Sequence, residues 1–351
     1  MTNEGQPWVS LVVRKTRLQV SQDPSLNYEY LPMVGMKSFI QASLELLLGK
    51  HNQAIVEKRV RHRVKIGAFK LGAQFLRTWH RNSQVVCIVS CQKELYGLVF
   101  QDMGFIVYEY SIWSPQELCS DPGRFFEVIE HIPADSILVI GNIVDCRLTQ
   151  SQWAKLMSTI KSKRIFPFFD VPCQGLATGD LEEDVRLLRY FVSLGFEFFC
   201  SQSLSKNFGI YGVVWRREQG NGELSCLLCI LKLIWGLYYS AFCYCNKIPE
   251  MINLKRRKKQ SLKAVVENIM LVKEKVKEKL RLLGTPGSWN HITEQSGTHG
   301  YLELNHQQVE FLIKKKHIYI PKNSRINFTC INARNIDYIT QSIHEAVMLT
   351  Q

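Results

Sequence analysis

Three polar side chains follow apolar segments of the chain, and together they could hold and react with a cofactor that carries an aldehyde. Lys206 follows an apolar run and a Ser-rich turn, whereas Asp170 and Asn142 each come directly after an apolar run. A lysine at a strand end is partly withdrawn from water, which leaves more of its amine neutral and nucleophilic. A carboxylate can keep a pyridine nitrogen protonated, and an amide can bond to a phenolic oxygen. This set of donors predicts pyridoxal phosphate as the cofactor.

The segments around these residues alternate between strand and helix patterns. Strands are expected at the three runs that precede the polar residues: Ile137–Gly141, Arg164–Phe169 and the run from Phe196 to Ser201. Helices are expected between them: Thr149–Lys163, with a capping box at Thr149 and Gln152, and Asp180–Gly195. This order produces a parallel sheet, whose ligands bind beyond the carboxyl ends of its strands. The three polar residues are therefore predicted to meet at one sheet edge, although each one alone is more typical of a cap, a turn or the surface.

The last part of the chain carries a second set of elements. Gln260–Gly284 is predicted to form a long amphipathic helix, because its apolar residues recur at helical spacing. The strands expected after it are Tyr301–Leu304, Ile318–Ile320 and Ile326–Ile331. The helices expected there are Val309–Lys315 and Ile336–Val347. We expect these elements to form a second, smaller unit.

Composition indicates a folded protein of one or two domains. The chain has 351 residues, of which 46% are hydrophobic and 21% are charged. Its formal net charge is +13, but the basic clusters lack the interleaved aromatic residues of nucleic-acid binders, so no nucleic-acid partner is predicted. The 11 cysteines follow no regular framework, and the chain shows no signal peptide. These features predict reduced thiols and a cytoplasmic location.

Several stretches of the chain are long enough to compare with a family: Glu29–Gly35, Phe166–Gly209, Gly284–Thr293, Lys316–Ile320 and Ser324–Val347. They resemble the class I aminotransferases, and within them the aspartate aminotransferases. The resemblance implies an α/β fold, the type I fold of PLP-dependent transferases. That fold has a mainly parallel sheet of the seven-stranded type in a large domain, which we expect at residues 30–259. The smaller α+β domain would comprise residues 1–29 and 260–351.

The resemblance also assigns roles to residues that hold the cofactor. Lys206 resembles the lysine that bonds to the cofactor aldehyde, and Asp170 resembles the carboxylate at its pyridine nitrogen. Asn142 resembles the amide at its phenolic oxygen. Ser203 and Ser205 resemble the serines on the phosphate side.

Two further roles concern the substrate and the partner subunit. Arg325 resembles the arginine that binds the substrate α-carboxylate, a role that suits the two parallel hydrogen bonds of a guanidinium. Tyr30 resembles the tyrosine that reaches the cofactor phosphate of the neighbouring subunit. The resemblance therefore implies a homodimer whose small-molecule partners are an amino acid and a 2-oxo acid.

Several positions depart from the family pattern. Val64–Ile66 stand where the family has small residues that approach the phosphate at a helix start. Lys93 replaces an aromatic ring over the cofactor, Cys173 replaces a tyrosine, and Ile137 replaces a histidine. These changes remove a stacking surface and several donors.

Residues 212–258 also depart from the family, in composition as well as in identity. Leu224–Cys245 is strongly apolar and Lys255–Lys259 is basic. An altered reading frame or splice would explain such a stretch. A buried or misfolded segment is the preferred interpretation, ahead of a membrane span or a zinc site, because one lysine interrupts the apolar run and no histidine lies near its cysteines. We therefore do not expect membrane association.

The predicted activity is a pyridoxal phosphate-dependent exchange of an amino group between aspartate and 2-oxoglutarate. The alternative is a relative that keeps the fold as a dimeric binding protein but has lost turnover. A third hypothesis is racemisation or decarboxylation, since Lys93 and Cys173 change the surroundings of the ring.

Overall fold

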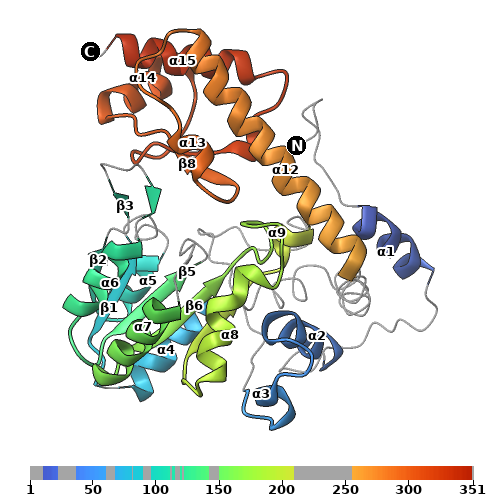
Figure 1. Cartoon of the computed structure of the whole chain (residues 1–351), viewed down its shortest axis with the longest axis vertical. Coiled ribbons are helices and arrows are strands. Elements are labelled where there is room, and N and C mark those ends of the chain that lie inside the picture. Colours follow the sequence, from blue (N-terminus) through green and yellow to red (C-terminus); the bar gives the residue numbers. More distant parts are fainter. Residues whose placement is uncertain are drawn as a thin grey trace.

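The computed structural model describes residues 11–22, 37–60, 68–80, 82–89, 96–110, 113–114, 119–120, 122–141, 150–208 and 255–349. A parallel sheet with its helices forms the lower part of Figure 1, and a mostly helical unit lies above it. The long helix α12 runs diagonally from one to the other.

The main sheet has the parallel arrangement that the sequence predicts. Its order is β2-β1-β5-β6-β7, and the bounds are β1 Val85–Val89, β2 Ile106–Tyr110, β5 Ile137–Gly141, β6 Phe166–Val171 and β7 Phe199–Gln202. All four pairings are parallel. Five strands of the sheet thus fall within the described residues, and the predicted α/β fold is confirmed.

Alternation along each strand divides the apolar side chains between two sheet faces. In β5, Ile137 and Val139 join one hydrophobic cluster, whereas Leu138 and Ile140 join the other. The first face is covered by α4 Ala68–Trp79 and α5 Leu98–Asp102. The second is covered by α6 Pro122–His131, α7 Gln150–Ser162 and α8 Arg186–Ser193. Since strands buried on both faces must be apolar throughout, the pattern explains the uninterrupted runs in the sequence.

Smaller elements surround this sheet. They are α1 Leu11–Ser21, α2 Lys37–Leu48, α3 Gln53–Val56, the antiparallel pair β3 Trp113–Ser114 and β4 Cys119–Ser120, the 3₁₀ turn Glu183–Val185, and α9 Ser205–Phe208. The single helix expected at Asp180–Gly195 is therefore a 3₁₀ turn followed by α8. The Asp184 carboxylate accepts the backbone N–H groups of Gly175, Ala177 and Thr178, which holds this residue in the turn.

One helix joins the two parts of the molecule. α12 spans Lys255–Leu282 and so begins five residues before the predicted start at Gln260. Leu262 packs in a cluster of the main sheet, whereas Val276 and Leu280 pack in the cluster of the C-terminal elements. The two hydrophobic cores therefore share one continuous helix.

The C-terminal elements are α13 His291–Glu294, β8 His299–Tyr301, α14 His306–Lys316, β9 Arg325–Asn327, the 3₁₀ turn Phe328–Cys330 and α15 Ile336–Met348. Three expected strands differ here. The strand expected over Tyr301–Leu304 is β8, which begins two residues earlier and ends at Tyr301. Ile318–Ile320 forms no strand, because the Ile318 N–H closes α14 by donating to the Leu312 carbonyl. The strand expected over Ile326–Ile331 ends at Asn327, whose side chain accepts from the Thr329 N–H and starts the 3₁₀ turn.

The division into residues 30–259 and residues 1–29 with 260–351 stays a prediction. Val13 of α1 packs in the cluster of the main sheet.

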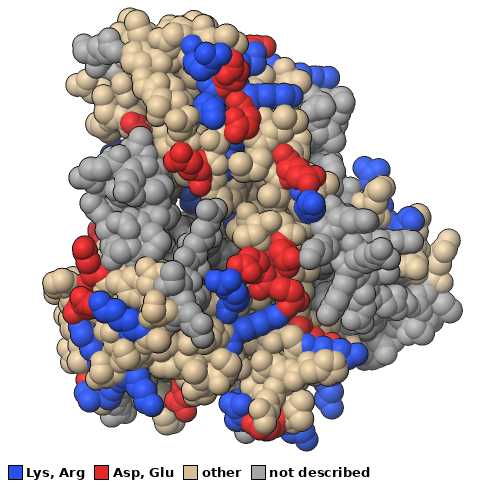
Figure 2. All heavy atoms as spheres, viewed as in Figure 1, with Lys and Arg blue, Asp and Glu red and all other residues tan. Residues whose placement is uncertain are grey.

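The apolar segment Leu224–Cys245 lies outside the described residues. Within the part of the chain that the structure describes, no helix is both long and apolar enough to span a bilayer. Acidic and basic side chains are interspersed over the face in Figure 2 rather than gathered by sign.

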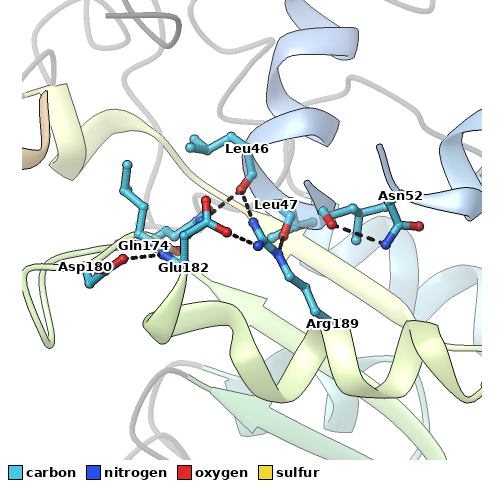
Figure 3. A network of polar contacts seen from close by, with 9 residues as sticks. Leu46, Leu47, Asn52, Gln174, Asp180, Glu182 and Arg189 are labelled. Atoms are coloured by element: carbon cyan, nitrogen blue, oxygen red, sulfur yellow. Dashed lines mark hydrogen bonds and ion pairs between the residues drawn. The ribbon is translucent and has the colours of Figure 1, made fainter. Parts of the chain in front are cut away.

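Side chains from distant segments satisfy the last carbonyl groups of α2 (Figure 3). Arg189 of α8 donates to the carbonyls of Leu46 and Leu47, at 3.2 and 2.9 Å, and pairs with Glu182. The Asn52 amide donates to the Leu48 carbonyl at 3.2 Å. A helix end leaves these carbonyls without intrahelical partners, so the contacts both cap α2 and attach it to α8.

Arg189→Leu removes two charge-assisted hydrogen bonds and an ion pair from this cap. We expect the free energy of unfolding in urea to fall by about 1.5–3 kcal/mol. The matched control is Arg186→Leu on the same helix, whose exposed pair with Glu183 should contribute within about 0.5 kcal/mol. Equal losses in the two variants would contradict the role of Arg189 as the cap.

Candidate active site

The carboxyl edge of the main sheet holds a buried carboxylate. Asp170 lies in β6, opposite Gly141 of β5 and Ser201 of β7, and is 1% exposed. The hydroxyl groups of Tyr96 and Ser201 donate to its two oxygens. Donors on both oxygens favour the ionised carboxylate in an otherwise apolar environment.

Sequence reasoning assigned no role to Tyr96, although it has the most direct contact with the predicted site. Its ring is buried and lies 4.3 Å from the ring of Phe69, between centroids. It follows β1 by seven residues, so it comes from the edge at which β6 also ends. A strand prediction at the apolar run Val85–Val89 would have been needed to find it.

Lys206 follows β7, the strand that pairs with the Asp170 strand β6, and its side chain is exposed. β7 ends at Gln202, and the buried Ser203 continues the pairing through its N–H, which donates to the Val171 carbonyl at 3.1 Å. Ser205 opens α9, and Lys206 is the second residue of that short helix. Because the Lys206 side chain is exposed, the prediction that its amine is partly withdrawn from water is wrong for this structure.

Gln174 connects the segments that carry Asp170 and Lys206. It is fully buried and donates to the carbonyls of Leu46 and Leu181, at 3.0 and 2.8 Å. Its side-chain oxygen accepts from Gln202, and its backbone carbonyl accepts from the amide of Asn207. These contacts fix the loop after β6 against both the end of β7 and the residue next to Lys206. Gln174 lies within the family-like stretch Phe166–Gly209, but the sequence predicts no role for it.

Arg325 comes from the C-terminal elements and lies on one face of the β8–β9 pair. Tyr301 is opposite Arg325, and His299 is opposite Asn327, so these four side chains share a face. Burial, and then the positive charges of Arg325, Lys206 and Lys273, lower the pKa of His299 to about 4. Lys206 and Arg325 therefore act on the same imidazole.

The remaining predicted positions divide into two groups. Asn142, Tyr30, Val64–Ile66 and Lys93 lie outside the described residues. Ile137 is in the core of the sheet, and Cys173 is partly buried after β6. Among the residues that the structure describes, no cluster of histidine, cysteine or acidic residues could hold a metal ion.

The described donors fit the ring and the aldehyde end of pyridoxal phosphate. A buried, doubly hydrogen-bonded carboxylate suits a protonated ring nitrogen, and Lys206 supplies an accessible amine on the adjacent strand connection. Burial, and then the Asp170 charge, raise the pKa of the nearby Cys200 thiol well above its usual value. The Cys200 thiol is thus kept neutral and unreactive.

Tyr96→Phe removes one donor from the buried carboxylate. We expect it to lower the free energy of unfolding by about 1.5–3 kcal/mol, since the acceptor is charged. The control is Tyr110→Phe, which removes a 3.3 Å bond to the neutral carbonyl of Val139 and should lose about 0.5–1.5 kcal/mol. Urea unfolding at neutral pH measures both, and a larger loss for the control would exclude an ionised Asp170 as the acceptor.

His299 predicts a pH dependence of stability. Its pKa of about 4 lies below the ordinary value of 6.5, so the unfolded chain takes up the proton first and stability falls as pH drops from 6.5 towards 4. His299→Gln should flatten that part of the profile, by at most about 1.4 kcal/mol per pH unit. His306→Gln, at an exposed position on α14, serves as the control and should leave the slope unchanged.

Comparison with known proteins gives consistent matches over the whole chain. The family model described as aminotransferase class I and II matches residues 2–343. A mouse protein named "Putative aspartate aminotransferase, cytoplasmic 2" is 68% identical, with 100% of this chain and 90% of that protein covered. The chicken protein named "Aspartate aminotransferase, cytoplasmic" is 36% identical, with the same coverage of both chains.

The fold has close counterparts among solved structures. A cytoplasmic aspartate aminotransferase from Saccharomyces cerevisiae superposes with a TM-score of 0.84 at 24% identity, covering 99% of this chain and 90% of that one. An aromatic-amino-acid aminotransferase from Burkholderia pseudomallei, with covalently bound pyridoxal phosphate, gives 0.81 at 22% identity, again with 99% and 90% covered. At these identities the comparisons establish the shared fold.

Proposed function

Because this chain belongs to the class I and II aminotransferases, we propose that it exchanges an amino group between aspartate and 2-oxoglutarate. The observation that carries the proposal is the joint effect of Lys206 and Arg325 on His299. The amine belongs to the connection after β7 and the guanidinium to the C-terminal elements, and the charges of both help to lower the pKa of His299. A 2-amino acid needs both groups, one near its nitrogen and one at its carboxylate.

Pyridoxal phosphate is the cofactor that family membership supports. When bound, its protonated ring withdraws electrons from the α-carbon of the substrate. Asp170 would hold the proton at the ring nitrogen, because Tyr96 and Ser201 keep its carboxylate charged. Ser203, Ser205, Asn142 and Tyr30 would complete the cofactor contacts.

The chain's own groups divide the remaining work. Lys206 would bind the cofactor through its amine and, once displaced by the substrate amine, move the proton at the α-carbon. Arg325 would orient the substrate by pairing with its α-carboxylate. The proposed assembly is a cytoplasmic homodimer, with Tyr30 reaching the neighbouring subunit. Residues 30–259 would form its large domain, and residues 1–29 with 260–351 its small one.

A non-catalytic dimeric binding protein is the second candidate. The exposure of Lys206 favours it, because the burial that activates a lysine as a nucleophile is missing at this position. The departures at Lys93 and Val64–Ile66 point the same way.

Lys206→Ala tests the cofactor bond. With pyridoxal phosphate, the unmodified protein should show a visible absorbance band that aspartate bleaches, and borohydride should fix the cofactor on the peptide that contains Lys206. The variant should show neither, whereas Lys155→Ala, at an exposed lysine of α7, should behave as the unmodified protein. A Lys206-dependent band that aspartate leaves unchanged would support the binding protein. Absence of any band would reject the proposed cofactor site.

Arg325→Gln tests substrate binding separately from cofactor binding. We expect the visible band to remain, while kcat/KM for aspartate falls roughly 10-fold to 100-fold, the equivalent of losing a charge-assisted pair of about 1.5–3 kcal/mol. An unchanged kcat/KM would remove Arg325 from the substrate site.

A further inference from the structure

His299 lies in the C-terminal elements, and charged groups from both parts of the molecule act on it. It is partly buried and lies in β8, which follows α13 and precedes α14. It shares the face of β8–β9 that carries Arg325. The opposite face is the packed one. A side chain added at Gly300 would approach Phe328 to 2.8 Å, and Ile326 lies in the C-terminal core.

The charged groups that bear on His299 come from three elements. Arg325 belongs to the paired strand β9, Lys206 to α9, and Lys273 to α12. Lys273 is fully buried, donates to the Gln295 carbonyl, and places its amine 5.2 Å from the centre of the Phe328 ring. The groups identified around His299 are thus all cationic.

Burial and the nearby positive charges together determine the state of the imidazole. With burial as the larger cause, the three cations keep the pKa of His299 near 4, so the ring is neutral at physiological pH. The Thr298 hydroxyl lies 2.9 Å from Nδ1, so that nitrogen is already engaged in a hydrogen bond. A neutral imidazole with a free N–H can bind an anion, and an anion placed among these cations reverses the field that opposes protonation.

We propose that His299 is a specificity-determining residue that takes up a proton when a ligand with two anionic groups binds at Arg325. One anionic group pairs with Arg325, and the second lies close enough to the imidazole to stabilise its charged form. The bound state then contains an imidazolium, and no proton is released elsewhere in the site. Ligands with a single anionic group lack the second contact, so they offset only the charge of Arg325 and gain less from protonation. The inference rests on the proposed function, because it takes Arg325 as the ligand anchor.

Linkage gives the direction of the effect. A group that gains a proton on binding makes binding tighter as pH falls, by up to tenfold for each unit by which the ligand raises its pKa. The site should therefore discriminate between dianions and monoanions more strongly in mild acid than at neutral pH. A ligand that is itself neutralised in acid would hide this effect, so the probe must be a strong acid.

The experiment uses the cofactor-loaded protein with histidines labelled at the ring carbon and 1,2-ethanedisulfonate as the dianion. Ethanesulfonate is the monoanionic control, and neither probe titrates in the range used. The His299 resonance is assigned by its loss in His299→Gln and titrated by NMR with and without each probe; the other eight of the nine histidines are internal controls. We expect the disulfonate to raise the pKa of His299 by more than ethanesulfonate does.

Calorimetry gives the second readout. Disulfonate binding should tighten roughly 5-fold to 10-fold from about pH 7.5 to about pH 5, and this gain should disappear in His299→Gln but persist in His306→Gln. An unmoved His299 resonance, or an equal pH dependence for both probes, would overturn the inference even when the Lys206-dependent absorbance band is present. Absence of that band would count against the proposed function, while the NMR titration would still decide the inference.

Discussion

Backbone hydrogen bonds between β5, β6 and β7 set the register on which the site depends. They place Gly141, Asp170 and Ser201 side by side, so that the Ser201 hydroxyl reaches the carboxylate of the neighbouring strand. A shift of one residue would turn Asp170 to the other face of the sheet, among apolar residues. The alternation of apolar residues between two helix layers prevents that shift, because it would expose or misplace every core side chain of β6.

The second constraint is the attachment of the connections to this sheet. Gln174 links the loop after Asp170 to Gln202, to the neighbour of Lys206 and to the end of α2. A buried amide with these partners cannot change one contact without losing others. The position of Lys206 therefore depends on residues far from it in sequence, although Lys206 itself faces solvent.

The sequence predicts elements with strong periodicity well and side-chain contacts between distant segments poorly. β5 has the predicted bounds, and α7 agrees closely, because each buries an uninterrupted apolar pattern. Tyr96 donates to a carboxylate 74 residues away, and Gln174 to a carbonyl 128 residues away. Neither contact leaves a periodic signal. His299 was missed because its strand has three residues and was expected to begin at Tyr301, which hid its shared face with Arg325.

The continuity of α12 has a mechanical consequence. At 28 residues it is about 42 Å long, and Leu262 lies near one end while Lys273 is about 16 Å further along the axis. A tilt of about 5° around Leu262 would displace Lys273 by roughly 1.4 Å and the far end, about 30 Å from Leu262, by roughly 2.6 Å. Because the C-terminal elements pack against this helix in one hydrophobic cluster, the distance between Arg325 and Lys206 depends on the angle of this single helix. Substitutions at Leu262, remote from both side chains, would alter the size of molecule that fits between them.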